Sequence, residues 1–205
     1  MYKVFVNHKE IILTAIPPTS GKHKVLPLAE TSFADILKVF KTTKVKKLYL
    51  VHHDPDSLMH LFKQKIKVTV AGGGVVRNHK NELLFIFRKK KWDLPKGRIE
   101  KNESLEAGAK REVKEETGVK QLRLGALAGK TFHIFKRNDQ YQLKETYWFF
   151  MDTAYAGPLS PETKEGISKA VWKNDKKTIK ALEKTYPNIK RLFEKINLPK
   201  SLPCS

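Results

Sequence analysis

Residues 97–119 of this 205-residue chain read GRIEKNESLEAGAKREVKEETGV, and they carry the strongest pattern in the sequence. Glu112, Glu115 and Glu116 stand at positions i, i+3 and i+4, which are neighbouring positions on the surface of a helix. Three carboxylates so close together repel one another unless a cation lies among them. Hard divalent cations such as Mg2+ take oxygen ligands and bind through a few carboxylates together with substrate phosphates. The spacing therefore predicts a helix that carries a divalent-metal site.

The same stretch predicts where this helix begins and ends. Ser104 is a residue type that caps helix N-termini, because its hydroxyl can accept a hydrogen bond from a free backbone N–H group. Gly118 can end the helix, since glycine adopts the left-handed conformation without strain. The side expected to pack on a core is an apolar stripe made of Leu105, Ala109 and Val113. The alternative is a solvated helix face, which charged runs such as KREVKEE form in most proteins.

The stretch resembles the signature box of the Nudix hydrolases at every fixed position. The shared pattern is Gly97, five residues, Glu103, seven residues, Arg111-Glu112-Val113, one residue, Glu115-Glu116, one residue and Gly118-Val119. A pattern with this many fixed positions is more specific than a short glycine motif. The resemblance implies an α+β fold, in which a mixed sheet lies between helices as an α/β/α sandwich. It also implies metal-dependent hydrolysis of a diphosphate that is linked to another group.

The resemblance assigns metal-binding roles to individual residues. Glu112, Glu115 and Glu116 are the expected ligands, joined by the backbone carbonyl of Lys96, which directly precedes the box. The expected cofactor is Mg2+, with Mn2+ as a substitute. Glu103 is expected to support the loop before the helix or to reach the metal through water.

The general base is left open between three carboxylates. In some family members it is the glutamate that corresponds to Glu112, which Arg111 can orient through a charge-assisted hydrogen bond. In other members it is a carboxylate from a later loop. The segment PETKEG, residues 161–166, offers Glu165, preferred by its position, and Glu162 as the second candidate. The alternative is that both are exposed loop carboxylates without a catalytic role.

Substrate recognition is expected on the segment just before the box. Its sequence, WDLPKG, contains the Pro-Lys-Gly form that resembles dinucleoside polyphosphate hydrolases more than the branch that sanitises nucleotide pools. The basic run Arg88-Lys89-Lys90-Lys91 precedes it and is expected near the substrate phosphates, although a solvated loop is the alternative. The residues expected to contact substrate are Arg88, Lys89, Lys96 and Glu103.

Composition narrows the choice of partners and of compartment. The formal net charge is +20, and a basic surplus favours polyanionic partners, so RNA is kept beside a phosphate-rich small molecule. The single cysteine, Cys204, excludes an internal disulfide and fits a reducing cytoplasm. Because no apolar run has the length of a signal segment or a bilayer span, we expect a cytoplasmic protein without a membrane partner.

Two parts are expected along the chain. Residues 1–66 are predicted to form a small α/β N-terminal domain, used for docking, dimerisation or as a lid, and this makes a homodimer plausible. Residues 67–205 are predicted to form the Nudix hydrolase domain. The glycines at 72–74 are not followed by Gly-Lys-Ser/Thr, so they indicate close backbone approach rather than a phosphate-binding loop.

Further elements of the second part are predicted from apolar periodicity. Residues 122–127 and 130–135 are expected to be two strands. Residues 176–184 are expected to be a helix that turns Ile179 and Leu182 inward, and Pro187 to begin a further helix.

Three functions stay open at this point. The leading one is hydrolysis of a nucleoside diphosphate derivative, such as a dinucleoside polyphosphate, ADP-ribose, a nucleotide sugar or a nucleoside triphosphate. The second is removal of pyrophosphate or a cap from RNA 5′ ends. The third is a catalytically silent Nudix fold that senses nucleotides, against which the complete box argues.

Overall fold

The computed structural model of the chain describes residues 1–21 and 23–196. These divide into a first unit, Met1–Thr69 with Phe132–Glu145, and a second unit, Val70–Thr131 with the chain from Thr146 onward. The predicted domain boundary between residues 66 and 67 stays a prediction. Cys204 lies outside the described residues. No helix within residues 1–21 and 23–196 has both the length and the apolar character needed to cross a bilayer.

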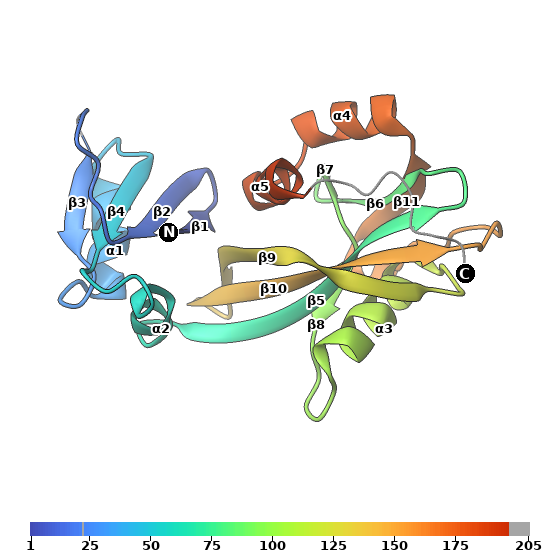
Figure 1. Ribbon diagram of the computed structural model, residues 1–205, viewed down its shortest axis with the longest axis horizontal. Coiled ribbons are helices and arrows are strands. Elements are labelled where there is room, and N and C mark those ends of the chain that lie inside the picture. The colour runs from blue at the N-terminus through green and yellow to red at the C-terminus, as the bar shows by residue number, and fades with distance from the viewer. Residues whose placement is uncertain (22, 197–205) are drawn as a thin grey trace. The chain divides into compact units, whose positions relative to one another are not determined.

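The first unit is a small sheet with two helices on one face (Figure 1). A hairpin of β1 and β2 is joined by parallel pairing to β4, and β4 pairs in parallel with the edge strand β3. Residues 132–134 of β9 pair in parallel with β1. Alternate strand residues such as Ile11 and Leu13 pack against buried residues of the helices, among them Ile36 and Phe62. The elements are β1 (Tyr2–Val6), β2 (Lys9–Thr14), β3 (Lys24–Pro27), α1 (Phe33–Thr42), β4 (Lys47–Val51) and α2 (Leu58–Lys63).

The second unit is an α/β/α sandwich, as the sequence predicts. Its strands lie in the order β11-β6-β5-β10-β9, with β7 beside β6 and β8 beside β5. Neighbouring strand residues belong to different cores, because successive side chains point to opposite faces. The strands are β5 (Lys67–Asn78), β6 (Leu83–Arg88), β7 (Lys91–Asp93), β8 (Lys96–Arg98), β9 (Arg123–Arg137), β10 (Gln140–Thr153) and β11 (Ile167–Lys173).

Helices cover both faces of this sheet. On one face Val76, Leu84 and Phe149 form a core with α3 (Leu105–Thr117). On the other face Val75, Phe85 and Trp148 form a core with α4 (Asp175–Glu183) and α5 (Pro187–Lys195). The alternation along β5, β6 and β10 therefore fixes where α3 lies relative to the strands (Figure 1).

Two details of the second unit differ from the predictions. The segments 122–127 and 130–135 are parts of one continuous strand, β9, because its partner β10 extends along the same length. The prediction that Ile179 turns inward is wrong, since its side chain is 65% exposed, whereas Leu182 is half-buried. Helix α4 packs instead through Ala181, and the hydroxyl of Thr178 donates to the Lys173 carbonyl at 3.3 Å.

The glycines of β5 allow the close approach that the sequence indicates. A Cβ atom on Gly73 would lie 2.6 Å from the Pro95 carbonyl oxygen, and one on Gly72 would lie 3.0 Å from the Ala109 backbone nitrogen. The N–H group of Gly74 donates to the same Pro95 carbonyl at 3.1 Å. Strand β5 thus holds the segment before β8 and the helix α3 directly against its backbone.

A buried polar pair gives a test of the second unit's packing. Trp148 is fully buried, and its indole N–H donates to the Thr131 hydroxyl at 2.9 Å. Thr131→Val should lower the free energy of unfolding by about 1–3 kcal/mol, because it leaves the indole N–H buried without an acceptor. Thr131→Ser keeps the hydroxyl and is the control. Denaturant unfolding monitored by fluorescence measures both; equal stability of Thr131→Val and Thr131→Ser would contradict the role of this bond.

Candidate active site

Helix α3 has the ends that the sequence predicts. The Ser104 hydroxyl accepts a hydrogen bond from the Ala107 N–H at 3.1 Å. Gly118 has a φ of 70°, and its N–H donates to the Lys114 carbonyl at 2.7 Å. Ala109 and Val113 are fully buried in the core beneath the helix. The helix is therefore fixed in rotation, and this rotation places its acidic residues.

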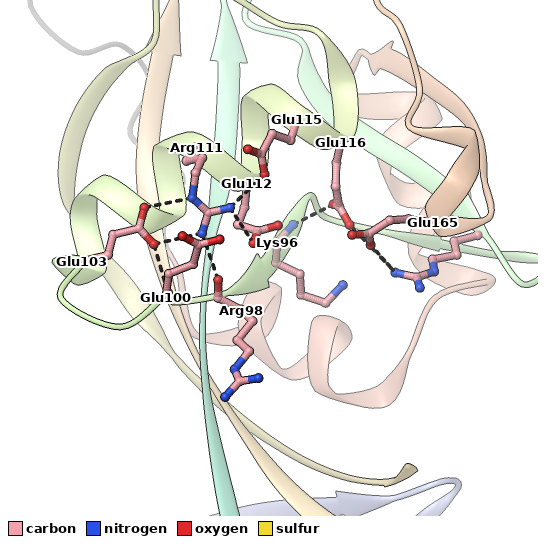
Figure 2. A network of polar contacts seen from close by, with 10 residues as sticks. Lys96, Arg98, Glu100, Glu103, Arg111, Glu112, Glu115, Glu116 and Glu165 are labelled. Carbon is pink, nitrogen blue, oxygen red and sulfur yellow. Dashed lines mark hydrogen bonds and ion pairs between the residues drawn. The ribbon is translucent and has the colours of Figure 1, made fainter. Parts of the chain in front are cut away.

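The three glutamates of α3 differ strongly in exposure (Figure 2). Glu116 is 1% exposed and Glu112 is 8% exposed, whereas the Glu115 side chain is 55% exposed. Glu112 lies directly over Gly97 of β8, where a Cβ atom would be only 1.7 Å from Glu112 Oε2. Any side chain at residue 97 would displace this carboxylate, so the glycine of the box is required by close packing.

Arg111 connects the acidic residues of the site. Its guanidinium binds Glu103 through two hydrogen bonds of 2.9 Å and donates to Glu112 at 2.9 Å and to Glu115 at 2.8 Å. It also donates to the Arg98 carbonyl at 3.0 Å. These bonds from Arg111, with one from the Glu100 N–H, lower the pKa of Glu103 to about 2. Arg111 therefore joins the loop before α3 to two of the expected ligands.

Glu116 has one carboxylate oxygen bound and one open. Glu116 Oε2 accepts a hydrogen bond from the Lys96 backbone N–H at 2.8 Å. Glu116 Oε1 is buried and has no hydrogen-bond partner, and the Arg88 guanidinium is 3.9 Å away. Burial raises the pKa of Glu116 to about 7, against the effect of Lys96. A buried acceptor without a partner is costly, so this oxygen is suited to a cation.

The loop after β10 places its two glutamates differently. The Ser160 N–H donates to the Thr117 carbonyl at 2.8 Å, and the Glu162 N–H donates to the Glu116 carbonyl at 3.2 Å. The Glu162 carboxylate caps the short 3-10 helix η1 (Thr163–Glu165) by accepting from the Lys164 N–H at 3.0 Å. Glu165 lies beside Glu116 in Figure 2, and its carboxylate is 3.3 Å from Arg88. Of the two candidates, Glu165 is the one that faces the site.

The basic run reaches the site only through its first residue. Arg88 is the last residue of β6 and pairs with Ile167 at the start of β11, which brings it next to Glu165. Lys89 and Lys90 form the turn between β6 and β7 with φ values of 50° and 61°, and both are exposed. The structure thus brings Arg88 together with the glutamates and leaves Lys89 at the tip of the turn.

Asp93 is a site residue that sequence reasoning missed. It is 5% exposed at the end of β7, and its carboxylate is 2.5 Å from the Lys96 ammonium. Burial would lower the pKa of Lys96, but the charges of Asp93 and Glu116 raise it overall. The available signal was an acidic residue in the otherwise apolar Trp-Asp-Leu-Pro segment, three positions before a lysine.

The residues present fit a divalent cation, although they do not form a closed cage. Within the described part of the chain, no three His, Cys, Asp or Glu side chains are gathered into a metal-binding group. The Arg111 guanidinium donates to both Glu112 and Glu115. The donors are all oxygens, which hard cations prefer, and the open oxygen of Glu116 is the group that lacks a partner.

Comparisons with known proteins identify a family and similar folds. The family model described as NUDIX domain matches residues 67–194. A MutT protein from Methanosarcina mazei Go1 is similar in structure, with a TM-score of 0.50, 25% identity, and coverage of 63% of this chain and 93% of that chain.

Two further solved structures show lower similarity. An Ap4A hydrolase of C. elegans, solved as a binary complex, has a TM-score of 0.49 and 18% identity, with 62% of this chain and 93% of that chain covered. A NUDIX hydrolase from Nitrosomonas europaea has a TM-score of 0.46 and 21% identity, with coverages of 63% and 88%.

The family match includes α3 with its glutamates, Gly97 beneath Glu112, and the sheet that carries them. With more than half of its residues matched in this way, the chain belongs to the Nudix family and is a pyrophosphohydrolase of that family.

Proposed function

We propose that the protein hydrolyses a diphosphate bond in a nucleoside diphosphate that is linked to another group. Nudix hydrolases generally need a divalent ion, and we propose Mg2+ here, with Mn2+ as a substitute. The observation that carries this proposal is the buried Glu116 Oε1, which has no hydrogen-bond partner beside a second inward-facing carboxylate, that of Glu112. Proposed substrates are a dinucleoside polyphosphate, ADP-ribose, a nucleotide sugar or a nucleoside triphosphate.

The proposed ligands of the ion are Glu112, Glu115, Glu116 and the Lys96 carbonyl. When bound, a divalent cation neutralises phosphate charge and makes water easier to deprotonate. Arg111 supports this arrangement, because its four hydrogen bonds to carboxylates hold Glu112 and Glu115 against Glu103. Both oxygens of Glu103 are used in bonds to Arg111, and Oε2 also accepts from the Glu100 N–H at 3.1 Å. Glu103 is therefore better suited to supporting the loop than to contacting substrate.

Glu165 is the proposed general base. It is half-exposed at the edge of the site, where water can reach it, and its neighbour Arg88 holds it beside Glu116. Glu112 is less suited, because Arg111 occupies one of its oxygens. The Glu162 carboxylate is used to cap η1. Arg88 is the proposed phosphate contact, since its guanidinium lies within the carboxylate cluster; Lys89 and Lys96 are retained as further contacts from the sequence.

A second candidate function, hydrolysis at RNA 5′ ends, is favoured by a group of lysines and rings that we name the lysine–aromatic surface. The Lys173 ammonium is 3.5 Å from the centre of the Trp92 ring, and the Lys91 ammonium is 4.9 Å from that of Tyr186. The ring centroids of Phe87 and Trp92 are 4.8 Å apart. Single-stranded nucleic acids are bound by such combinations of positive charge and aromatic side chains.

The positive charges of the lysines on this surface are not neutralised by nearby carboxylates within the part of the chain that the structure describes. Burial lowers the pKa of Lys173, and the nearby charges of Lys177 and Lys169 lower it further. Lys91, Lys169, Lys173 and Lys177 form no ion pair with a described residue. Burial raises the pKa of Tyr186, and the charge of Asp93 adds to this effect, whereas the charges of Lys96 and Arg88 act against it. The cytoplasmic location, the homodimer and the role of residues 1–66 stay predictions.

Glu116→Gln tests the metal site. It should lower kcat by about 100-fold or more. Substitution of residues that only hydrogen-bond to metal ligands already lowers metal affinity or activity by about 10–100-fold. Steady-state hydrolysis of a panel of nucleoside diphosphate derivatives with Mg2+ measures the loss, and product identity shows which bond is cleaved. The control is Glu106→Gln, an exposed position in the first turn of the same helix. Near-normal kcat for Glu116→Gln would remove it from the site.

The two loop glutamates form a matched pair for testing the general base. Glu165→Gln should lower kcat by about 100- to 10,000-fold, the usual contribution of a general base, without changing the metal concentration needed for half-maximal rate. Glu162→Gln should keep most of the activity, because its effect is on the cap of η1. Pre-steady-state and steady-state rates at saturating metal measure both. Equal losses in the two variants would show that the loop acts only as a structural support.

The lysine–aromatic surface is tested with Lys91→Gln, because Lys91 is half-buried whereas Lys173 is buried. For a 5′-triphosphorylated oligoribonucleotide, KM should rise and its dependence on salt should become shallower by about 0.7 in log–log slope per lost phosphate contact. For ATP, KM should stay unchanged. Lys120→Gln, an exposed lysine just after α3, is the control. Hydrolysis of ATP without any turnover of the RNA would exclude the second candidate function.

A further inference from the structure

We propose that Asp93 is a positioning residue of the metal site: it holds the Lys96 ammonium away from Glu116, so that Glu116 Oε1 stays open to a cation. This inference rests on the proposed function of the same site. Within the described residues, the Asp93 carboxylate is bonded to Leu94 and Lys96, and the proposed effect on Glu116 runs through Lys96.

Both oxygens of the Asp93 carboxylate have defined partners. Asp93 Oδ1 accepts a hydrogen bond from the Leu94 N–H at 2.8 Å, and Asp93 Oδ2 binds the Lys96 ammonium at 2.5 Å. The same ammonium lies 3.4 Å from the Leu94 carbonyl. The four residues from Asp93 to Lys96 therefore form a turn that is closed by an ion pair between its first and last side chains.

Lys96 binds Glu116 through its backbone, whereas its ammonium is paired with Asp93. Its N–H binds Glu116 Oε2, and its carbonyl is a proposed metal ligand. In Figure 2 its side chain extends away from Glu112 and Glu115. The preceding carbonyl, that of Pro95, accepts from the Gly74 N–H at 3.1 Å, which fixes the turn to β5.

The Lys96 ammonium has few alternative partners. The Lys96 side chain is only 12% exposed, and a buried ammonium without a carboxylate is strongly destabilising. If Asp93 lost its charge, Glu116 would offer the ammonium a buried oxygen that lacks a hydrogen bond, on a carboxylate that already binds the N–H of the same lysine. An ammonium bound there would compete with a divalent ion for the same oxygen. Asp93 prevents this competition by neutralising the lysine within the turn.

The test is the affinity for Mn2+, measured without turnover by electron paramagnetic resonance of the free ion. Asp93→Asn should weaken Mn2+ binding by about 10–100-fold, the range found for residues that support metal ligands. Lys96→Met is the reference variant, because it removes the ammonium and keeps the N–H and the carbonyl of residue 96. The double variant Asp93→Asn/Lys96→Met should bind Mn2+ within a few-fold of Lys96→Met, because the competing ammonium is gone.

The double variant shows whether Asp93 prevents competition by the Lys96 ammonium or only supports the fold. If the double variant binds Mn2+ as weakly as Asp93→Asn, or if Asp93→Asn binds as tightly as the wild type, the proposal is overturned. Thermal unfolding of each variant checks its fold. If Asp93→Asn alone does not fold, the double variant provides the test, because it has no unpaired buried charge. Mn2+ binding at the level of Lys96→Met then supports the proposal. Loss of Mn2+ binding overturns it.

Failure of the proposed function has a different signature. Absence of Mn2+ binding by the wild type, together with no cleavage of any diphosphate in the substrate panel, would overturn both proposals. Normal cleavage and Mn2+ binding by the wild type, with no rescue in the double variant, would overturn only the role of Asp93.

Discussion

The site depends on keeping two carboxylates, Glu112 and Glu116, inside the protein on one side of a helix. An unpaired buried charge costs about 3–5 kcal/mol, so these groups need partners that the fold must supply. Arg111 supplies charge to Glu112, and the Lys96 N–H supplies a hydrogen bond to Glu116. One oxygen, Glu116 Oε1, is left without a hydrogen bond. The electrostatic cost that remains at this oxygen is the basis for proposing that a divalent cation binds there.

The close approach of backbones is the second requirement of the same site. Gly97 leaves room for Glu112, and Gly73 leaves room for the Pro95 carbonyl. In this way β5, β8 and α3 lie nearer to one another than strands and helices with side chains at these positions could. The shape of the site thus depends on missing Cβ atoms as much as on the acidic residues themselves.

Local signals made part of this structure predictable. The bounds of α3 follow from Ser104 and Gly118, because caps act within a single turn of helix. The α/β/α sandwich follows from the box and from the order of apolar segments. The contacts Arg88–Glu165 and Asp93–Lys96 were not predicted, since the first joins residues far apart in sequence and the second depends on a buried turn. The inward face of α4 was misassigned at Ile179 because small residues, Thr178 and Ala181, make its closest contacts. Glu165 was preferred over Glu162 by its position in the sequence, and which of the two is the general base stays a proposal.

The hairpin of β9 and β10 has a consequence for how this chain can be divided. Its outer part, Phe132–Glu145, belongs to the first unit, where Phe132, Ile134 and Leu143 are buried among residues from the N-terminal segment. A fragment that began near residue 70 would still carry these three side chains but would lack most of the residues that cover them. Such a fragment would expose these apolar side chains to solvent, where exposed apolar surface favours aggregation. The chain passes between the two units at three points, so a single cut cannot separate one unit from the other.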